Sequence, residues 1–159
     1  MSKQALLISV RPRFAQMIFD GSKTVELRRV RPRVGKGDLV FVYVSSPVKA
    51  LEGVFEIDEV ACTSPNAVWH RFGKKTALSK HEFETYYEGT QEAYAIAVAR
   101  YWRLSSPVEL AALKKQQKDF YPPRVITTSL SRISHIRWAL FFPHLFLRRN
   151  QNRHELVCF

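Results

Sequence analysis

Residues 19–29 read Phe-Asp-Gly-Ser-Lys-Thr-Val-Glu-Leu-Arg-Arg, a turn followed by a short stretch of alternating side chains. Gly21 lets the chain turn sharply off the end of a preceding helix. The alternation of polar and apolar residues up to Arg28 predicts a half-buried strand with one charged side. A lysine, a carboxylate and a guanidinium at Lys23, Glu26 and Arg28 are suited to grip a phosphate and read a base edge together. The same three residues also fit a solvated strand face whose charges neutralise one another.

The segments on either side of this stretch predict a mixed fold. Ser79 and Glu82 have the spacing of a capping box, which marks the start of one helix. The expected strands are Ala5–Val10, Thr24–Arg28, Leu39–Val44, Ala50–Val60 and Ala93–Tyr101, and the expected helices are Pro12–Phe19, Pro65–Phe72, Ser79–Tyr87 and Ser106–Lys118. About five strands with helices inserted between them favour an α+β barrel over an alternating parallel sheet.

The composition indicates a single basic globular domain. The chain has 159 residues, 46% of them hydrophobic, and 25 basic against 14 acidic side chains give it a net charge of +11. Such an excess of positive charge favours polyanionic partners. Cys62 and Cys158 form neither a disulfide framework nor a metal spacing, which fits a reducing, cytoplasmic environment. The apolar run 138–147 is interrupted by Pro143 and is shorter than the roughly 20 residues of a membrane span, so no membrane partner is expected.

The pattern Gly21-x-Lys23-x-x-Glu26-x-Arg28 after a short helix resembles the signature of the ASCH domain, a PUA-like family. Three further segments resemble the same family in the same order: Val-Tyr-Val-Ser-Ser-Pro-Val-Lys-Ala at 42–50, Glu-Phe-Glu-Thr-Tyr-Tyr-Glu-Gly at 82–89 with Ala-Tyr-Ala-Ile at 93–96, and Phe-Tyr-Pro-Pro-Arg at 120–124. The resemblance covers about residues 4–130 and is greatest to a subgroup described as predicted transcriptional regulators.

The resemblance implies an α+β fold, a small mixed PUA-like β-barrel of about five or six strands flanked by short helices. The expected domain spans residues 1–130, followed by a basic, partly apolar helical extension at 131–159. The resemblance also implies that the domain binds RNA, another single-stranded nucleic acid or a nucleotide in a basic cleft. The residues expected to line or extend that cleft are Lys23, Glu26, Arg28, Arg29, Arg31, Arg33, Tyr43, Ser45 and Ser46.

Each cleft residue has an expected role. Lys23 and Arg28 hold phosphate, and Glu26 orients Arg28 or accepts a hydrogen bond from a base amino group. Tyr43 stacks on a base, and the hydroxyls of Ser45 and Ser46 form the opposite lip. An ordinary turn before Pro47 is an equally good interpretation of the two serines.

Two other classes of function remain open from the sequence. The first is a hydrolase, either a ribonuclease or an enzyme resembling N4-acetylcytidine amidohydrolases, with Lys23 and Glu26 as the catalytic candidates. Those amidohydrolases carry a threonine three residues after the lysine, where this chain has Glu26. The second is a regulatory module that binds a protein, or itself, through residues 138–147. No cofactor or metal is expected, because the glycines form no phosphate-binding loop and His70 and His81 lack partners at ligand spacing.

Overall fold

The computed structural model describes residues 5–116, 118 and 120–123, which form one five-stranded sheet with short helices around it. In chain order the elements are β1 (Ala5–Val10), α1 (Pro12–Phe19), β2 (Val25–Arg28), β3 (Leu39–Val44), β4 (Ala50–Thr63), α2 (Pro65–Phe72), the 3-10 turn η1 (Gly73–Lys75), α3 (Lys80–Tyr86), β5 (Ala93–Glu109) and α4 (Leu110–Gln116).

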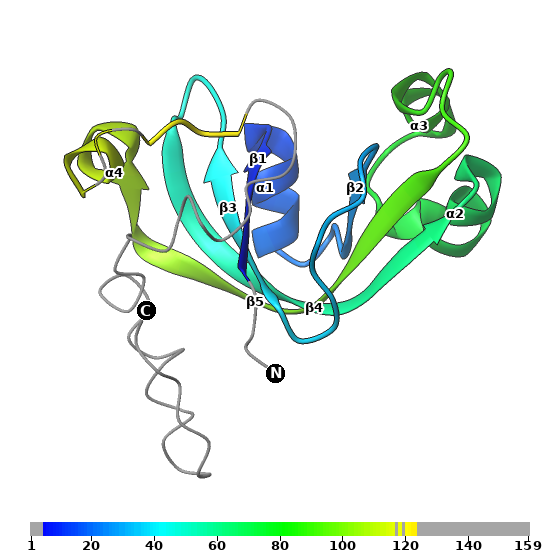
Figure 1. Cartoon of the computed structure of the whole chain (residues 1–159), viewed down its shortest axis with the longest axis horizontal. Helices are drawn as coiled ribbons and strands as arrows, with labels where there is room; N and C mark the ends of the chain where they lie inside the picture. Colours follow the sequence, from blue (N-terminus) through cyan, green and yellow to red (C-terminus); the bar gives the residue numbers. More distant parts are fainter. Residues whose placement is uncertain (1–4, 117, 119, 124–159) are drawn as a thin grey trace, which may run out of the picture.

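The sheet is mixed and partly open, with the strand order β1-β3-β4-β5-β2. β1 and β3 are parallel, whereas the other neighbouring pairs are antiparallel. The long β4–β5 pair crosses the whole molecule, with α4 at one end and α2 and α3 at the other, and α1 lies between them (Figure 1). This arrangement confirms the expected α+β, PUA-like architecture.

Three apolar clusters hold the helices to the sheet. In the α1 cluster, Ile18 packs against alternate residues of β3 such as Val42. In the α4 cluster, Leu113 packs against the residues of β3 that point to the other side, such as Phe41. In the α2–α3 cluster, Phe83 packs against Val25 and neighbouring residues. Because every strand residue from Val40 to Val44 is buried, β3 forms the centre of the fold.

One expected helix begins later than its sequence predicts. Ser106 to Glu109 belong to β5, and α4 begins only at Leu110. Glu109 and Val108 pair with Ala50 and Leu51 of β4, so the strand continues past Pro107. Pro107 falls in a break of the ladder between Arg103 and Val108, where a proline need not donate a backbone hydrogen bond. The expected helical extension at 131–159 lies outside the described residues.

β2 forms one edge of the sheet, and side chains cap the backbone on its outer side. Val98 N of β5 donates to Thr24 O at 2.9 Å, so the carbonyl of Thr24 faces β5. Because backbone carbonyls alternate in direction along a strand, those of Val25 and Leu27 face outward, away from β5. Lys23 Nζ donates to Val25 O at 2.8 Å, and the hydroxyl of Tyr86 donates to Leu27 O at 3.3 Å. The edge strand is therefore fixed by one lysine and one tyrosine.

Candidate nucleic-acid interface

The structure brings Lys23, Glu26 and Arg28 together in one buried cluster. Glu26 Oε1 lies 2.8 Å from Arg28 Nη2, and its Oε2 lies 3.4 Å from Lys23 Nζ. Gly21, with φ of +82°, provides the turn that directs Lys23 back toward the strand. The exposed fraction is below one tenth for all three residues: Lys23 3%, Glu26 8% and Arg28 7%. The cluster thus lies inside the fold, with a net charge of one positive unit if all three groups are ionised.

Lys23 is fully engaged by groups of the protein itself. Its ammonium donates to Val25 O at 2.8 Å and to Thr76 O at 2.7 Å, and its third contact is the carboxylate of Glu26. An ammonium has three N–H donors, so none remains for a phosphate in this arrangement. Burial lowers the pKa of Lys23, an effect that the charge of Glu26 partly opposes. Lys23 therefore fixes the position of Glu26 and of the loop around Thr76.

Arg28 has donors that the protein does not use. Its Nη2 is close enough to Glu26 to form an ion pair, but within the described part of the chain neither Nη2 nor Nε has a hydrogen-bond partner of suitable angle. A buried guanidinium with open N–H groups is costly unless a further acceptor completes it. Both nitrogens have almost no exposed surface, so an anion or carbonyl oxygen reaches them only if neighbouring side chains move, while Glu26 holds the guanidinium in its orientation.

Tyrosines of α3 and its C-terminal end flank the strand that carries this cluster. The hydroxyl of Tyr87 donates to the carbonyl oxygens of Arg28, at 3.0 Å, and of Tyr94, at 3.3 Å. Burial raises the pKa of Tyr87 well above its ordinary value, and burial also raises the pKa of Tyr86. Both tyrosines therefore remain neutral hydrogen-bond donors that hold β2 against α3.

Three residues of this site were not anticipated from the sequence. Thr76 accepts the hydrogen bond of Lys23 through its backbone carbonyl, so its side-chain type gives no signal. Arg13 of α1 and Glu82 of α3 form an ion pair at 3.3 Å that joins these two helices. Glu82 was expected only as a helix cap, a role that the structure confirms through its contacts with Ser79.

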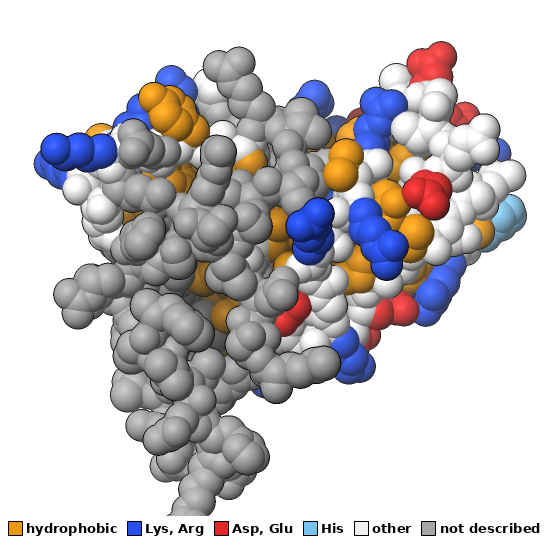
Figure 2. Space-filling view, viewed as in Figure 1, with side chains coloured by type: hydrophobic (Ala, Val, Ile, Leu, Met, Phe, Trp, Pro, Cys, Tyr) orange, Lys and Arg blue, Asp and Glu red, His pale blue; other side chains and the backbone are white. Residues whose placement is uncertain are grey.

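The basic loop after β2 places its side chains on the surface. Arg29 donates to the carbonyl oxygen of Glu88 at 3.2 Å, while Arg31 and Arg33 are exposed. Lys36 instead forms an ion pair with Asp58 at 3.0 Å. On the face seen in Figure 2, Lys and Arg side chains stand among hydrophobic ones, and acidic side chains lie on the same face. The basic residues on this face are thus scattered among apolar and acidic ones.

Of the residues expected to form the opposite lip, which are Tyr43, Ser45 and Ser46, Tyr43 lies on a different side of the sheet from Glu26. Tyr43 is buried in the α4 cluster, whereas Glu26 pairs across the ladder with Ile96 of the α1 cluster. The hydroxyl of Tyr43 has no hydrogen bond within the described residues, and burial raises the pKa of Tyr43. Ser45 is partly exposed and Ser46 exposed, in the turn before Pro47. The structure therefore separates Tyr43 from the Lys23–Glu26–Arg28 cluster.

Neither a metal site nor a membrane-spanning helix is found in the part of the chain that the structure describes. Within residues 5–116, 118 and 120–123, no three His, Cys, Asp or Glu side chains are grouped closely enough to hold a metal ion. No helix in the same part of the chain is long and apolar enough to cross a membrane. The expected contact surface at 138–147 lies outside the residues that the structure describes.

Known proteins resemble this chain over most of its length. A family model described as "Domain of unknown function (DUF365)" matches residues 4–134. An ASCH domain-containing ribonuclease of Zymomonas mobilis is 31% identical over 125 residues, which cover 79% of this chain and 84% of that protein. The crystal structure of ASCH from Zymomonas mobilis matches with a TM-score of 0.75 and 29% identity, over 83% of this chain and 92% of that one. The crystal structure of its Tyr-to-Phe variant matches with a TM-score of 0.74 and 30% identity, over 79% of this chain and 89% of that one.

Proposed function

This chain belongs to the ASCH domain family, and we propose that it binds single-stranded RNA through the guanidinium of Arg28. The observation that carries the proposal is that Nε and Nη2 of this buried side chain have no hydrogen bond of suitable angle within the described residues, although Nη2 lies 2.8 Å from the carboxylate of Glu26. Glu26 holds the guanidinium in place, and Lys23 in turn holds Glu26. A guanidinium fixed in this way is suited to a phosphate or to a base carbonyl. The net charge of +11 supports a polyanionic partner.

The surface arginines have a supporting role in this proposal. Arg29, Arg31 and Arg33 follow β2 directly and are exposed. Exposed cations attract the phosphate backbone without reading sequence, and their contribution weakens as salt rises. We therefore assign the anchoring contact to Arg28 and the general attraction for RNA to the loop. A regulatory role in transcription is one use to which such binding could be put.

Arg28→Lys tests the proposal most sharply, because it keeps the positive charge and removes the planar donors. We expect a short single-stranded RNA, followed by fluorescence anisotropy, to bind roughly tenfold more weakly, since directed hydrogen bonds to a charged group are lost. Arg31→Lys is the matched control, because Arg31 is exposed and has no hydrogen bond among the described residues, and it should bind within about twofold of wild type. A folded Arg28→Lys protein with unchanged affinity would overturn the assignment. The same sequence as DNA tests whether the preference is for RNA.

RNA cleavage is a second candidate function, favoured by the relative that is named a ribonuclease. Tyr43, whose hydroxyl has no hydrogen bond to any other described residue, belongs to the last two residues of β3, just before the β3–β4 turn. In that turn Lys49 is exposed and has φ of +52°, a conformation unusual for a residue other than glycine. A phenol can transfer a proton, and an ammonium can stabilise charge that develops on a phosphate.

A labelled RNA incubated with the pure protein tests this second candidate. Tyr43→Phe should abolish new products while leaving RNA binding unchanged, because only the hydroxyl is removed. Tyr101→Phe is the control, since Tyr101 is exposed and belongs to β5. If wild type produces no fragments under any salt condition in which it binds RNA, the cleavage function is excluded and binding remains. Cleavage that survives in Tyr43→Phe would exclude this tyrosine.

A further inference from the structure

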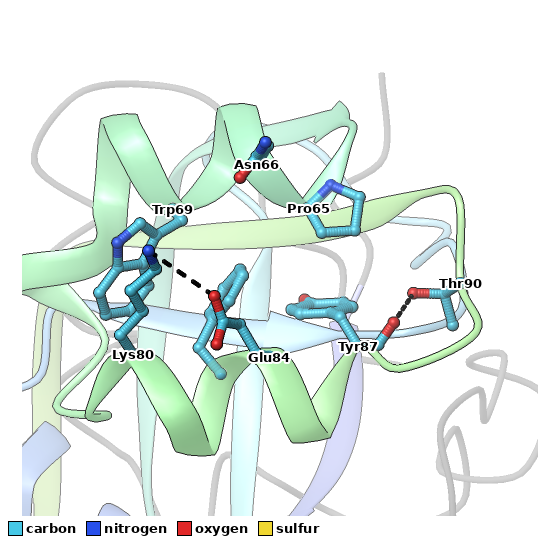
Figure 3. Close-up of a pocket in the computed structure, with 8 residues that line it drawn as sticks. Pro65, Asn66, Trp69, Lys80, Glu84, Tyr87 and Thr90 are labelled. Atoms are coloured by element: carbon cyan, nitrogen blue, oxygen red, sulfur yellow. Dashed lines mark hydrogen bonds and ion pairs between the residues drawn. The ribbon is translucent and has the colours of Figure 1, made fainter.

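A pocket of about 200 Å³ lies between α2 and α3, apart from the Arg28 cluster. Figure 3 shows α2 and α3 on opposite sides, with Trp69 from α2 and Glu84 and Tyr87 from α3 and its C-terminal end between them. The lining residues are Pro65, Asn66, Trp69, Lys80, Phe83, Glu84, Tyr87 and Thr90. Val25 and Leu27 face this side of β2, whereas Glu26 and Arg28 face the other, so the pocket is a separate site.

Aromatic rings form the interior of the pocket and are held rigidly. The ring centroids of Trp69 and Phe83 are 5.0 Å apart, and those of Phe83 and Tyr87 are 4.8 Å apart. A Cβ added at Gly73 would lie 2.9 Å from the indole of Trp69. Because glycine has no Cβ, the indole can pack directly against the backbone at this position. Phe83 and Tyr87 are buried, but Trp69 is only partly so. Trp69 therefore presents a fixed ring that a ligand can contact.

The polar groups around the pocket carry no net charge. Lys80 and Glu84 form an exposed ion pair at 3.7 Å, one supplying donors and the other acceptors. Asn66 is exposed, and within the described part of the chain its amide has no hydrogen bond. Glu88 directly after Tyr87 is exposed and adds negative charge that disfavours a phosphate here. The site suits an uncharged planar group that offers both donors and acceptors at its edge.

We infer that this pocket is a nucleobase subsite, which receives one base of the RNA whose backbone Arg28 binds. The volume is below the range of pockets that enclose drug-sized ligands, so it fits a single ring system. Stacking on an aromatic ring is the usual way in which single-stranded RNA is held without strict sequence preference. The inference rests on the proposed RNA binding for the identity of the ligand.

The two sites are joined through the backbone at the end of β2. Tyr87 lines the pocket and donates its hydroxyl to the carbonyl of Arg28 at 3.0 Å. Arg29, the next residue, donates to the carbonyl of Glu88 at 3.2 Å, directly after Tyr87. An exposed arginine therefore lies between the pocket and the buried guanidinium, where it can neutralise the connecting phosphate.

The experiment uses the full chain and two kinds of probe. The first kind is an uncharged nucleoside, either cytidine or adenosine, and the second is a short single-stranded RNA. The indole N–H signal of Trp69 in a ¹⁵N–¹H spectrum, identified by its absence in Trp69→Phe, should shift with the nucleosides and with the RNA. Trp69→Ala should weaken RNA binding about tenfold while the salt dependence stays as in wild type, because a stacked base carries no charge. Trp102→Ala is the control for loss of a tryptophan elsewhere, since Trp102 packs against the α4 cluster.

The possible outcomes separate the pocket from the proposed function. If RNA binds and neither probe shifts the Trp69 signal, the nucleobase subsite is wrong and RNA binding stands. If nucleosides shift the signal but RNA does not bind, the pocket stands and the proposed function is wrong. Should Trp69→Ala fail to fold, Asn66→Ala replaces it, because that side chain is exposed and unpaired in the described structure. A loss of the nucleoside-induced Trp69 shift in Asn66→Ala supports the subsite, and a shift of the same size and affinity as in wild type shows that nucleosides bind outside this pocket.

Discussion

The ammonium of Lys23 donates a hydrogen bond of 2.7 Å to the carbonyl oxygen of Thr76, 53 residues further along the chain. The two residues are joined a second time by their neighbours, because Thr24 N donates to Lys75 O at 3.0 Å. The loop after α2 is therefore tied to the start of β2 by one side-chain and one backbone hydrogen bond. Lys23 links the Lys23–Glu26–Arg28 cluster to the part of the fold that carries α2 and α3.

Lys23→Met should destabilise the fold by about 3 to 5 kcal/mol, the usual cost of removing one partner from a buried ion pair. Methionine keeps the apolar stem but leaves the carbonyls of Val25 and Thr76 without their donor. Urea unfolding followed by circular dichroism measures the loss. Lys75→Met is the control, since its side chain is exposed, and should change stability by no more than about 0.5 kcal/mol. A Lys23→Met protein of full stability that binds RNA poorly would show instead that the lysine contacts the ligand.

The contribution of Tyr87 to the free energy of unfolding should decrease in alkaline solution. Burial raises its pKa above the ordinary 10.0, so the folded state keeps a proton that the unfolded state releases. The contribution of Tyr87 is therefore complete below about pH 10 and decreases at higher pH, by at most about 1.4 kcal/mol per pH unit. Urea unfolding between about pH 9 and 11 should show a shallower decline for Tyr87→Phe than for wild type.

Two comparisons make the alkaline measurement specific to Tyr87. The lowered pKa of Lys23 acts in the opposite direction, adding stability as pH rises, but it does so in both proteins and cancels in their difference. Tyr121→Phe should decline as steeply as wild type, because Tyr121 is 73% exposed. Parallel curves for wild type and Tyr87→Phe would contradict the prediction.

Gly53→Ala should be strongly destabilising, although it adds a single methyl group. A Cβ at Gly53 would lie 2.5 Å from the ring of Phe19 and 2.5 Å from the carbonyl oxygen of Trp102. The backbone of Trp102 and the buried ring of Phe19 cannot both move away from the added methyl group. We therefore expect the free energy of unfolding, measured with urea, to fall by about 1 to 3 kcal/mol or more. Gly35→Ala is the matched control, because a Cβ there meets no atom within 4 Å. Equal stabilities of the two variants would show that the α1 cluster can rearrange.

The sequence predicts the elements of this fold well where local signals are strong. Leu39–Val44 is found as expected, because six successive β-branched, aromatic or apolar residues favour a strand. The capping box of Ser79 and Glu82 places the start of α3 correctly. In contrast, Pro107 suggested a helix start where pairing with β4 continues the strand, since tertiary pairing overrides local preference.

The candidate site was only partly predictable. The convergence of Glu26 and Arg28 follows from their spacing on one strand, and the structure shows it. The engagement of Lys23 depends on the backbone carbonyl of Thr76, and a backbone acceptor leaves no mark in the sequence. Tyr43 lies in a strand that is buried on both sides, so alternation alone does not tell which side it faces.

The capped outer side of β2 has a consequence for how this protein behaves at high concentration. An exposed edge strand is a template on which a strand of another molecule can add. Here the outward carbonyls of Val25 and Leu27 already accept hydrogen bonds from Lys23 and Tyr86, so these two positions are blocked for an added strand of another molecule. The lysine and the tyrosine that hold the strand carrying Arg28 thereby also disfavour fibril-like growth from that edge.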